Sequence, residues 1–248
     1  MPFTLSHPAI ILPLLTKKSK WFSASGLIAG SMIPDFEYFI RMKVQSIYSH
    51  TLPGLFIVDL PLAIVVCFAY HKIIRNSLLK NLPQFLKSRF VSFMSFQWTV
   101  QFKMHVPMVL LSIVIGAASH LLWDDFTHEN GYFVLHSTYL QHHIKVGPST
   151  VPVYKICQHA SSLIGAIVIG VVVFQFRKQS SVHLRPNKLY WPFTLLITLT
   201  ITITRFLFAK HLFNIGNLIV TIIGAVFITL VIAPFFMKEI EWSTPSTS

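Results

Sequence analysis

The sequence predicts an all-α protein: a polytopic transmembrane helical bundle with about five full spans and short interfacial helices at its N-terminus. Of its 248 residues, 53% are hydrophobic and only 11% are charged, and the mean hydropathy is +0.63. A soluble domain has about a quarter of its residues charged, so this surface is too apolar for water. Because we find neither an internal repeat nor a long linker, we expect residues 1–240 to form a single integral-membrane domain, followed by a short polar tail at 241–248.

Two apolar runs near the N-terminus are too short to cross a bilayer. Residues 9–15 form a run that stops before three lysines, and residues 21–33 form a second run that contains glycines and serines. A hydrocarbon core requires about 20 consecutive apolar residues. We therefore expect two short helices that lie in the interface or pack against the bundle. Pro34 ends the second helix and places Asp35 at its mouth.

The full spans are the long apolar runs that follow. We expect them at 52–70, 106–123, 156–176, 190–210 and 215–237. Asp59 lies inside the first run, and a carboxylate within a span is costly enough that it should face protein or a water-filled cavity. Residues 71–105 are rich in Lys and Arg and are expected to be a loop whose own apolar stretch is too short to cross.

The most informative stretch is S-H-L-L-W-D-D-F-T-H, at 119–128, where the second span ends. His120, Asp124 and His128 are four residues apart, so on a helix they project from one face. Imidazole nitrogen and carboxylate oxygen are ordinary zinc ligands, and ligands one turn apart can share an ion. The stretch therefore indicates a metal site, and the alternative is a helix end that simply emerges into water.

Span counting brings further ligand-type side chains to the same end of the bundle. Because consecutive spans run antiparallel, the start of the first, the end of the second and the start of the third share one membrane face, and the N-terminal segment lies there too. The histidines and aspartates at these places are His7, Asp35, His50, His120, Asp124 and His159. The alternatives are histidines that cap helices or lie in the interface. For His159, a core histidine bonded to Gln158 or Ser161 is a further alternative.

Several blocks of the sequence resemble a known family. They are M-P-F-T-L-S-H at 1–7, G-S-M-I-P-D-F at 30–36, S-H-T-L-P-G-L-F at 49–56, S-H-L-L-W-D-D-F-T-H at 119–128 and Q-H-A-S-S at 158–162. Together they resemble a family of bacterial multispanning proteins, domain of unknown function 4184, which has no established activity. The order of His, Pro-Asp, Ser/Thr-His and His-x-x-x-Asp is also distantly similar to membrane-bound metal-dependent hydrolases and to zinc-dependent phospholipase C.

The distant resemblance implies a zinc site with one to three ions. Carried over residue by residue, it assigns metal binding to His7, Asp35, His50, His120 and Asp124, with His128 as a further ligand. The phospholipases complete their last site with His-x-x-x-Glu, and no such pair follows His128 here. The nearest substitutes are His136, His142, His143 and His159.

The chemistry that this resemblance implies is hydrolysis of a phospholipid or a lipid-linked phosphate. Two zinc ions about 3.5–4 Å apart would activate water and stabilise both oxygens of a phosphodiester. Asp124 would bridge the ions, and Asp35 would orient or deprotonate the water. Two alternatives remain: a transporter with a path lined by Asp59 and Arg205, and a structural protein with a non-catalytic metal site.

The charge balance favours a membrane partner and not a nucleic acid. Lys and Arg number 20 against 8 acidic residues, but the positive residues are scattered over loops, which suits anionic lipid headgroups. The family resemblance implies the bacterial cytoplasmic membrane. The face that carries residues 71–105, 177–189 and the tail has 11 Lys and Arg, and the ligand face has 9, so the positive-inside rule favours an external site.

Overall fold

A computed structural model describes residues 3–15, 21–179 and 185–237. The described chain is almost entirely helical, and five helices are long and apolar enough to cross a membrane. The prediction of an all-α membrane protein with five spans is therefore confirmed. The polar tail predicted at 241–248 lies outside the described residues.

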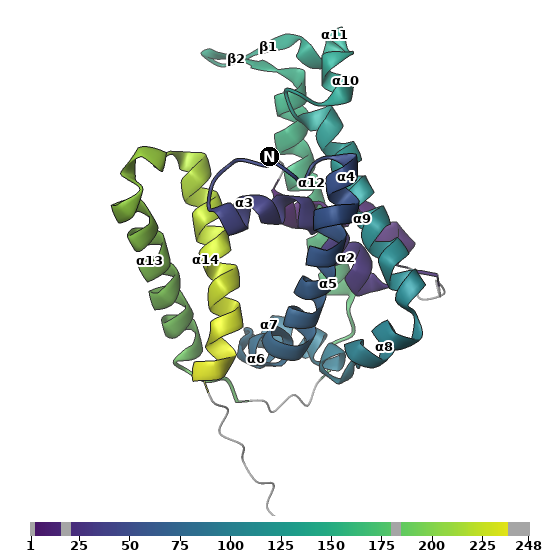
Figure 1. The fold of residues 1–248 in the computed structure, drawn as a ribbon, viewed down its shortest axis with the longest axis vertical. Coiled ribbons are helices and arrows are strands. Elements are labelled where there is room, and N and C mark those ends of the chain that lie inside the picture. Colours follow the sequence, from purple (N-terminus) through teal and green to yellow (C-terminus); the bar gives the residue numbers. More distant parts are fainter. Residues whose placement is uncertain (1–2, 16–20, 180–184, 238–248) are drawn as a thin grey trace, which may run out of the picture. The chain divides into compact units, whose positions relative to one another are not determined.

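The described elements follow one another with short connections (Figure 1). In chain order they are η1 (Thr4–Ser6), α1 (Pro8–Ile11), η2 (Leu12–Leu14), α2 (Ala24–Met32), η3 (Ile33–Asp35), α3 (Phe36–Arg41), α4 (Leu52–Gly54), η4 (Leu55–Asp59), α5 (Leu60–Ala69), η5 (Tyr70–Ile74), α6 (Arg75–Asn81), α7 (Gln84–Phe90), η6 (Val91–Ser95), α8 (Trp98–Met104), α9 (Val106–Thr127), α10 (Tyr132–Leu135), α11 (Thr138–Gln141), β1 (His143–Val146), β2 (Ser149–Pro152), α12 (Val153–Gln175), α13 (Tyr190–Phe208), η7 (Lys210–Leu212) and α14 (Ile215–Phe236). Here η4 and η5 are π-helical turns and the other η elements are 3-10 helices.

The chain folds into two compact units, which are described separately. Unit 1 comprises Met1–Phe68 and Gln97–Arg177, and unit 2 comprises Ala69–Phe96 and Lys178–Ser248. Unit 1 contains α9 and α12, and unit 2 contains α13 and α14. The expectation of a single domain stays a prediction.

The first span is longer than the sequence indicated. Its helix runs over Leu52–Asn81 and continues through the π-helical turns η4 and η5, although we had expected it to end at Tyr70. The basic residues after Tyr70 suggested a loop, but the helix continues and buries Ile74 and Leu79 together with the polar Arg75. Asp59, at the end of η4, is fully buried and accepts a hydrogen bond from the Ser49 hydroxyl at 2.7 Å, so the expectation that this carboxylate faces protein is confirmed.

Residues 128–152, between α9 and α12, contain two short helices and a β-hairpin. Strands β1 and β2 pair in antiparallel register, from His143 opposite Pro152 to Val146 opposite Ser149. Gly147 begins the tight turn with φ +60°, a conformation that favours glycine. The hairpin leads directly into α12 and is the one β-sheet among the described residues.

The core of unit 1 is built on the close packing of α2 against α9 (Figure 1). A Cβ atom on Gly30 would lie 2.2 Å from the carbonyl oxygen of Ile113, and one on Gly116 would lie 2.4 Å from that of Leu27. Small residues allow helices in membranes to approach this closely. The approach brings the end of α2 against the last turns of α9, where His120 lies.

Closing this gap should destabilise the protein. We expect Gly116→Ala to lower the free energy of unfolding by about 1–3 kcal/mol, because the new methyl group meets backbone atoms that cannot rotate away. Thermal unfolding in detergent measures the change. Gly170→Ala is the matched control, since a Cβ there meets nothing within 4 Å, and this change should be neutral or stabilising by up to about 1 kcal/mol. Equal effects of the two substitutions would contradict the packing argument.

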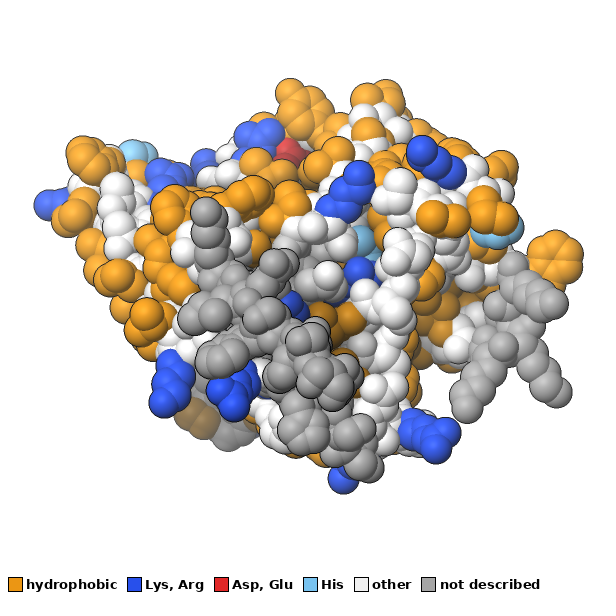
Figure 2. All heavy atoms as spheres, turned by 90° about the horizontal axis from the view of Figure 1, so that it is seen from below, with side chains coloured by type: hydrophobic (Ala, Val, Ile, Leu, Met, Phe, Trp, Pro, Cys, Tyr) orange, Lys and Arg blue, Asp and Glu red, His pale blue; other side chains and the backbone are white. Residues whose placement is uncertain are grey.

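The outer surfaces of the long helices suit lipid. On α12 the side chains of Leu163, Ile167 and Phe174 are each more than half exposed. Figure 2 shows hydrophobic side chains over much of the visible face, with Lys and Arg groups among them and few Asp or Glu. In unit 2, α13 and α14 pack together with a hydroxyl contact of 3.3 Å between Thr198 and Thr229. The protein is therefore an integral membrane protein in contact with lipid.

Candidate metal centre

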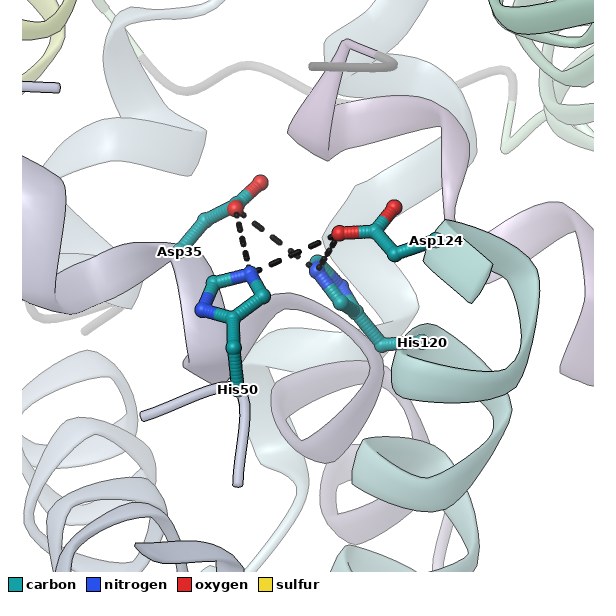
Figure 3. Close-up of side chains that lie close together, drawn as sticks. All are labelled: Asp35, His50, His120 and Asp124. Carbon is teal, nitrogen blue, oxygen red and sulfur yellow. Dashed lines mark ion pairs between the residues drawn. The ribbon is translucent and has the colours of Figure 1, made fainter. Parts of the chain in front are cut away.

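Four side chains from three segments of unit 1 meet in one group: Asp35, His50, His120 and Asp124 (Figure 3). One ligand-type atom from each lies within 4.8 Å of the others. Asp35 Oδ1 lies 3.5 Å from His50 Nε2 and 3.6 Å from His120 Nε2. Asp124 Oδ2 lies 3.4 Å and 3.3 Å from the same two nitrogens. We call these four residues the metal centre.

The distances within the metal centre fit ligands around an ion better than direct hydrogen bonds. Charge-assisted N–H···O bonds are about 2.7–2.9 Å long, and every contact here is longer. Ligand atoms held about 2.0–2.1 Å from a tetrahedral zinc lie about 3.3–3.4 Å from one another. Asp35 Oδ1, His50 Nε2 and His120 Nε2 are also buried without a hydrogen-bond partner, and buried polar atoms are rarely left so.

His120 is oriented by the backbone of α2. Its ring is fully buried, and Nδ1 lies 2.8 Å from the carbonyl oxygen of Ser31. Because a carbonyl oxygen only accepts, we assign the proton to Nδ1, which leaves the Nε2 lone pair directed at Asp35 and Asp124. A lone pair facing two carboxylate oxygens requires a cation or a proton between them. The hydrogen bond from Nδ1 to a carbonyl is the arrangement that metal-binding histidines commonly adopt.

Asp35 enters the metal centre from the other side. It ends the 3-10 turn η3, which Pro34 helps to start, and its side chain is 1% exposed. The hydroxyl of Thr4 donates to Oδ2, so that Oδ1 is the oxygen left facing the two imidazoles. Burial alone would raise the pKa of Asp35, but positive charge beside it, whether on protonated His120 and His50 or on a bound cation, lowers the pKa below its usual value. The carboxylate is therefore ionised and suited to bind a cation.

His50 comes from a loop with a constrained backbone. Its φ of +57° lies in the left-handed region, which non-glycine residues seldom adopt and which recurs at functional sites. Ser46 Oγ lies 3.3 Å from Nδ1, and Nε2 faces the two carboxylates. Thr51 caps the helix that follows by accepting from the N–H of Gly54.

Glu37 holds this loop in place. Its carboxylate accepts hydrogen bonds from the backbone N–H groups of Ile47, Tyr48 and Ser49 at 2.9–3.0 Å, and from Arg41 at 2.8 Å. Burial alone would raise the pKa of Glu37, but these backbone bonds lower the pKa to about 2. Glu37 thereby fixes the path of the chain directly before His50.

Removing the negative charge of Glu37 should weaken metal binding without removing a ligand. Glu37→Gln keeps the shape of the side chain, but a neutral amide accepts three backbone N–H groups poorly, so His50 loses its fixed position. We expect zinc affinity to fall by about tenfold, as for other groups that orient ligands. A competition titration with a fluorescent zinc chelator measures this. Glu129→Gln, at an exposed acid beyond the end of α9, should leave the affinity unchanged, and an equal loss in both variants would contradict the role of Glu37.

His7 and His128 lie on the other side of Asp124. Oδ1 of Asp124 is 3.7 Å from His7 Nε2 and 3.4 Å from His128 Nδ1. The side chain of His7 is 1% exposed. Its ring stacks on the ring of His120 at 3.8 Å and has no hydrogen-bond partner at either nitrogen. Burial and the neighbouring His120 lower the pKa of His7 to about 3, which keeps the ring neutral and able to bind a metal. Asp124 therefore presents one oxygen to His50 and His120, and the other to His7 and His128.

The model of one protein family matches residues 1–235, nearly the whole chain, under the description "Domain of unknown function (DUF4184)". The chain belongs to the DUF4184 family. The resemblance of the sequence to this family is thus confirmed. No match was found among curated proteins or solved structures. The similarity to metal-dependent hydrolases and to zinc-dependent phospholipase C stays a prediction.

His159 is not brought to the metal centre of this DUF4184 protein. It is exposed on α12, whereas the preceding residue, Gln158, is buried with Nε2 3.4 Å from His128 Nε2. The other substitutes considered from the sequence are also exposed; they are His136, His142 and His143. Two of the three buried residues of α12, Gln158 and Gly165, are seven apart and mark the face turned inward. A helical periodicity with Gly165 on the inner face therefore predicts that Gln158, and not His159, points inward.

Other supporting groups in this DUF4184 protein were not singled out from the sequence. Thr4, Ser31 and Glu37 act on the ligands through a hydroxyl, a carbonyl and a carboxylate. The role of Glu37 could have been predicted from the sequence. An acid inside the apolar stretch I-P-D-F-E-Y-F-I is costly to bury unless its carboxylate accepts hydrogen bonds. Thr4 and Ser31 carry no such signal, since their roles follow from tertiary packing alone.

Proposed function

We propose that this protein is a membrane-embedded, metal-dependent hydrolase that cleaves a phosphate ester of a phospholipid or a lipid-linked phosphate. The observation that carries the proposal is the metal centre, in which two carboxylates and two imidazoles face one another in a buried space with unpartnered nitrogen and oxygen atoms. Zinc is the ion whose preferred ligand types match this set. A divalent ion there would act as a Lewis acid and lower the pKa of water towards about 7.

The residues of the metal centre have distinct roles in this proposal. His50 and His120 hold the ion through Nε2, and Asp124 contributes Oδ2. Asp35 Oδ1 is the group that orients the attacking water and accepts its proton, since the Thr4 hydroxyl already occupies Oδ2. The carboxylate of Asp124 can also bridge to a second ion, because Oδ1 faces His7 and His128. The protein would then hold one ion at the metal centre and a second beside it.

The position of the metal centre along α9 supports a lipid substrate. Asp124 lies one turn before the end of α9, and α9 is one of the five helices long and apolar enough to span a membrane. The end of a span lies near the level of lipid headgroups. A phosphate ester at that depth can reach the metal centre while its apolar part stays in the bilayer.

A structural metal site is the second candidate function. Four protein ligands with no open position are typical of structural zinc, and three members of the metal centre are buried, with His50 as the least buried. A transporter is favoured less, because Asp59, the acid within the first span, is bonded to Ser49 and does not line an open path. Measurement of hydrolysis separates the proposed hydrolase from a structural metal site.

The test is hydrolysis of phospholipids by zinc-loaded protein in detergent. We expect wild type to release the headgroup or its phosphate, and Asp35→Asn to lower the rate at least about a hundredfold, the lower range for loss of a general base. His211→Ala should keep the full rate, since His211 is exposed and belongs to unit 2. Zinc content is measured in every variant. Wild type that binds zinc and hydrolyses no phospholipid or lipid-linked phosphate would favour the structural candidate.

A further inference from the structure

A pocket of about 270 Å³ lies beside the metal centre, between the N-terminal segment, α9 and α12. Its walls are mainly apolar: Ala9 and Ile10 come from α1, Trp123 comes from α9, and Ile164 and Val168 come from α12. All of these residues belong to unit 1. No residue of the metal centre lines the pocket.

His7 connects the pocket to the metal centre. It lines the pocket, and its ring also stacks on His120 and faces Asp124 Oδ1. Two hydrogen bonds hold the N-terminal segment on α12: the N–H of Phe3 donates to Ser162 Oγ, and the hydroxyl of Ser6 donates to the carbonyl of Ser162. The pocket and the metal centre therefore meet at this one side chain, and one lipid molecule is long enough to reach both.

Two side chains of the pocket wall are exposed at the surface of unit 1. Ile164 is 60% exposed and Ile10 is 43% exposed, and α12 is long and apolar enough to span the membrane. Lipid chains surround such a helix, so a chain can enter the pocket sideways and remain in apolar surroundings. The transfer then carries little desolvation cost, because bilayer and pocket are alike in polarity.

We propose that this pocket holds an acyl chain of a phospholipid whose phosphate lies at the metal centre, an inference that rests on the proposed function. The pocket is slightly smaller than most small-molecule sites, which measure about 300–1,000 Å³. It suits a stretch of one unbranched chain better than a methyl-branched isoprenoid. Ala9 and Gly165 contribute little or no side chain to its lining. The pocket would select substrates by the shape of the chain next to the headgroup.

The test is photo-crosslinking with a phosphatidic acid that carries a diazirine on one acyl chain, using the full-length protein in detergent micelles. We expect wild type to be labelled in the peptide that contains Ser161 to Val168. Ile164→Trp should fill the pocket and lower this labelling by about tenfold, which corresponds to loss of about 1.4 kcal/mol of binding. Leu163→Trp is the matched control, since Leu163 is equally exposed but does not line the pocket, and its labelling should equal that of wild type.

A second pair of variants guards against misfolding. Val168→Phe changes the pocket wall, and Ile167→Phe changes the adjacent residue outside it. Zinc content equal to wild type shows that each variant is folded. Loss of labelling in Ile164→Trp and Val168→Phe alone supports the inference. Unchanged labelling in both, labelling of wild type only at other peptides, or labelling of this peptide by a diazirine polyprenyl phosphate but not by the phosphatidic acid would overturn it.

This experiment is independent of catalysis. Labelling at the pocket without any hydrolysis would overturn the proposed reaction and leave the acyl-chain site in place. Hydrolysis with the chain labelling elsewhere would overturn the acyl-chain site and leave the proposed reaction. A further expected result links the two: Ile164→Trp should slow hydrolysis of long-chain phospholipids about tenfold, whereas the control Leu163→Trp should hydrolyse them at the wild-type rate.

Discussion

Asp124→Asn is expected to lower zinc affinity at least about a hundredfold, the upper end of what groups that merely orient ligands contribute. Asp124 is the one residue whose two carboxylate oxygens face four imidazoles among the described residues, namely those of His50 and His120 on one side and His7 and His128 on the other. Asparagine keeps the size of the side chain and removes its charge. The remaining ligands then cannot complete the coordination of the ion.

The measurement is a competition titration of purified protein with a chelator of known zinc affinity. His50→Ala should cause a similar loss, since it also removes a ligand of the metal centre. His211→Ala should bind zinc like wild type, because this side chain is exposed on unit 2. Tight binding retained by both Asp124→Asn and His50→Ala would place the zinc elsewhere in the protein.

Removal of the metal should lower the stability of the protein by about 4 kcal/mol, the linkage expected when free zinc exceeds its dissociation constant about a thousandfold. Without the ion, the carboxylates of Asp35 and Asp124 lie on either side of ring nitrogens that have no hydrogen-bond partner. A shift of about 10 °C in the melting temperature corresponds to this free energy in a protein of this size. Thermal unfolding with and without a chelator gives the value.

A double variant provides the control for this effect. Asp35→Asn combined with Asp124→Asn removes both buried charges and the binding site, so chelation should leave its melting temperature unchanged. We also expect this variant to melt above chelated wild type, because neutral amides cost less to bury than unpaired carboxylates. An equal response of the two proteins to the chelator would mean that the ion does not act at the metal centre.

The spans and the meeting of the ligands were predictable because both follow from simple rules. Apolar runs of sufficient length fix α9, α12, α13 and α14 to within a few residues. The antiparallel order of spans then places distant segments at one end of the bundle. His50 and His120 lie 70 positions apart in the sequence and still face the same two carboxylates.

The local details were not predictable, because they depend on register and on tertiary contacts. His159 and Gln158 differ by one position on α12, which turns one side chain outward and the other inward. Glu37 acts on the loop before His50 through bonds to backbone groups that any residue carries. The extension of the first helix to Asn81 was missed because basic residues follow Tyr70, whereas the helix itself continues through them.

Bound metal in the purified protein tests the central claim most directly. We expect inductively coupled plasma mass spectrometry to find at least about one zinc per chain in wild type, after incubation with zinc and removal of the excess. We expect His120→Ala to retain less than about a tenth of that amount, because His120 is fully buried in the middle of the metal centre. Wild type without bound metal, or equal metal in wild type and His120→Ala, would contradict the account and would make the group a network of protonated histidines and carboxylates.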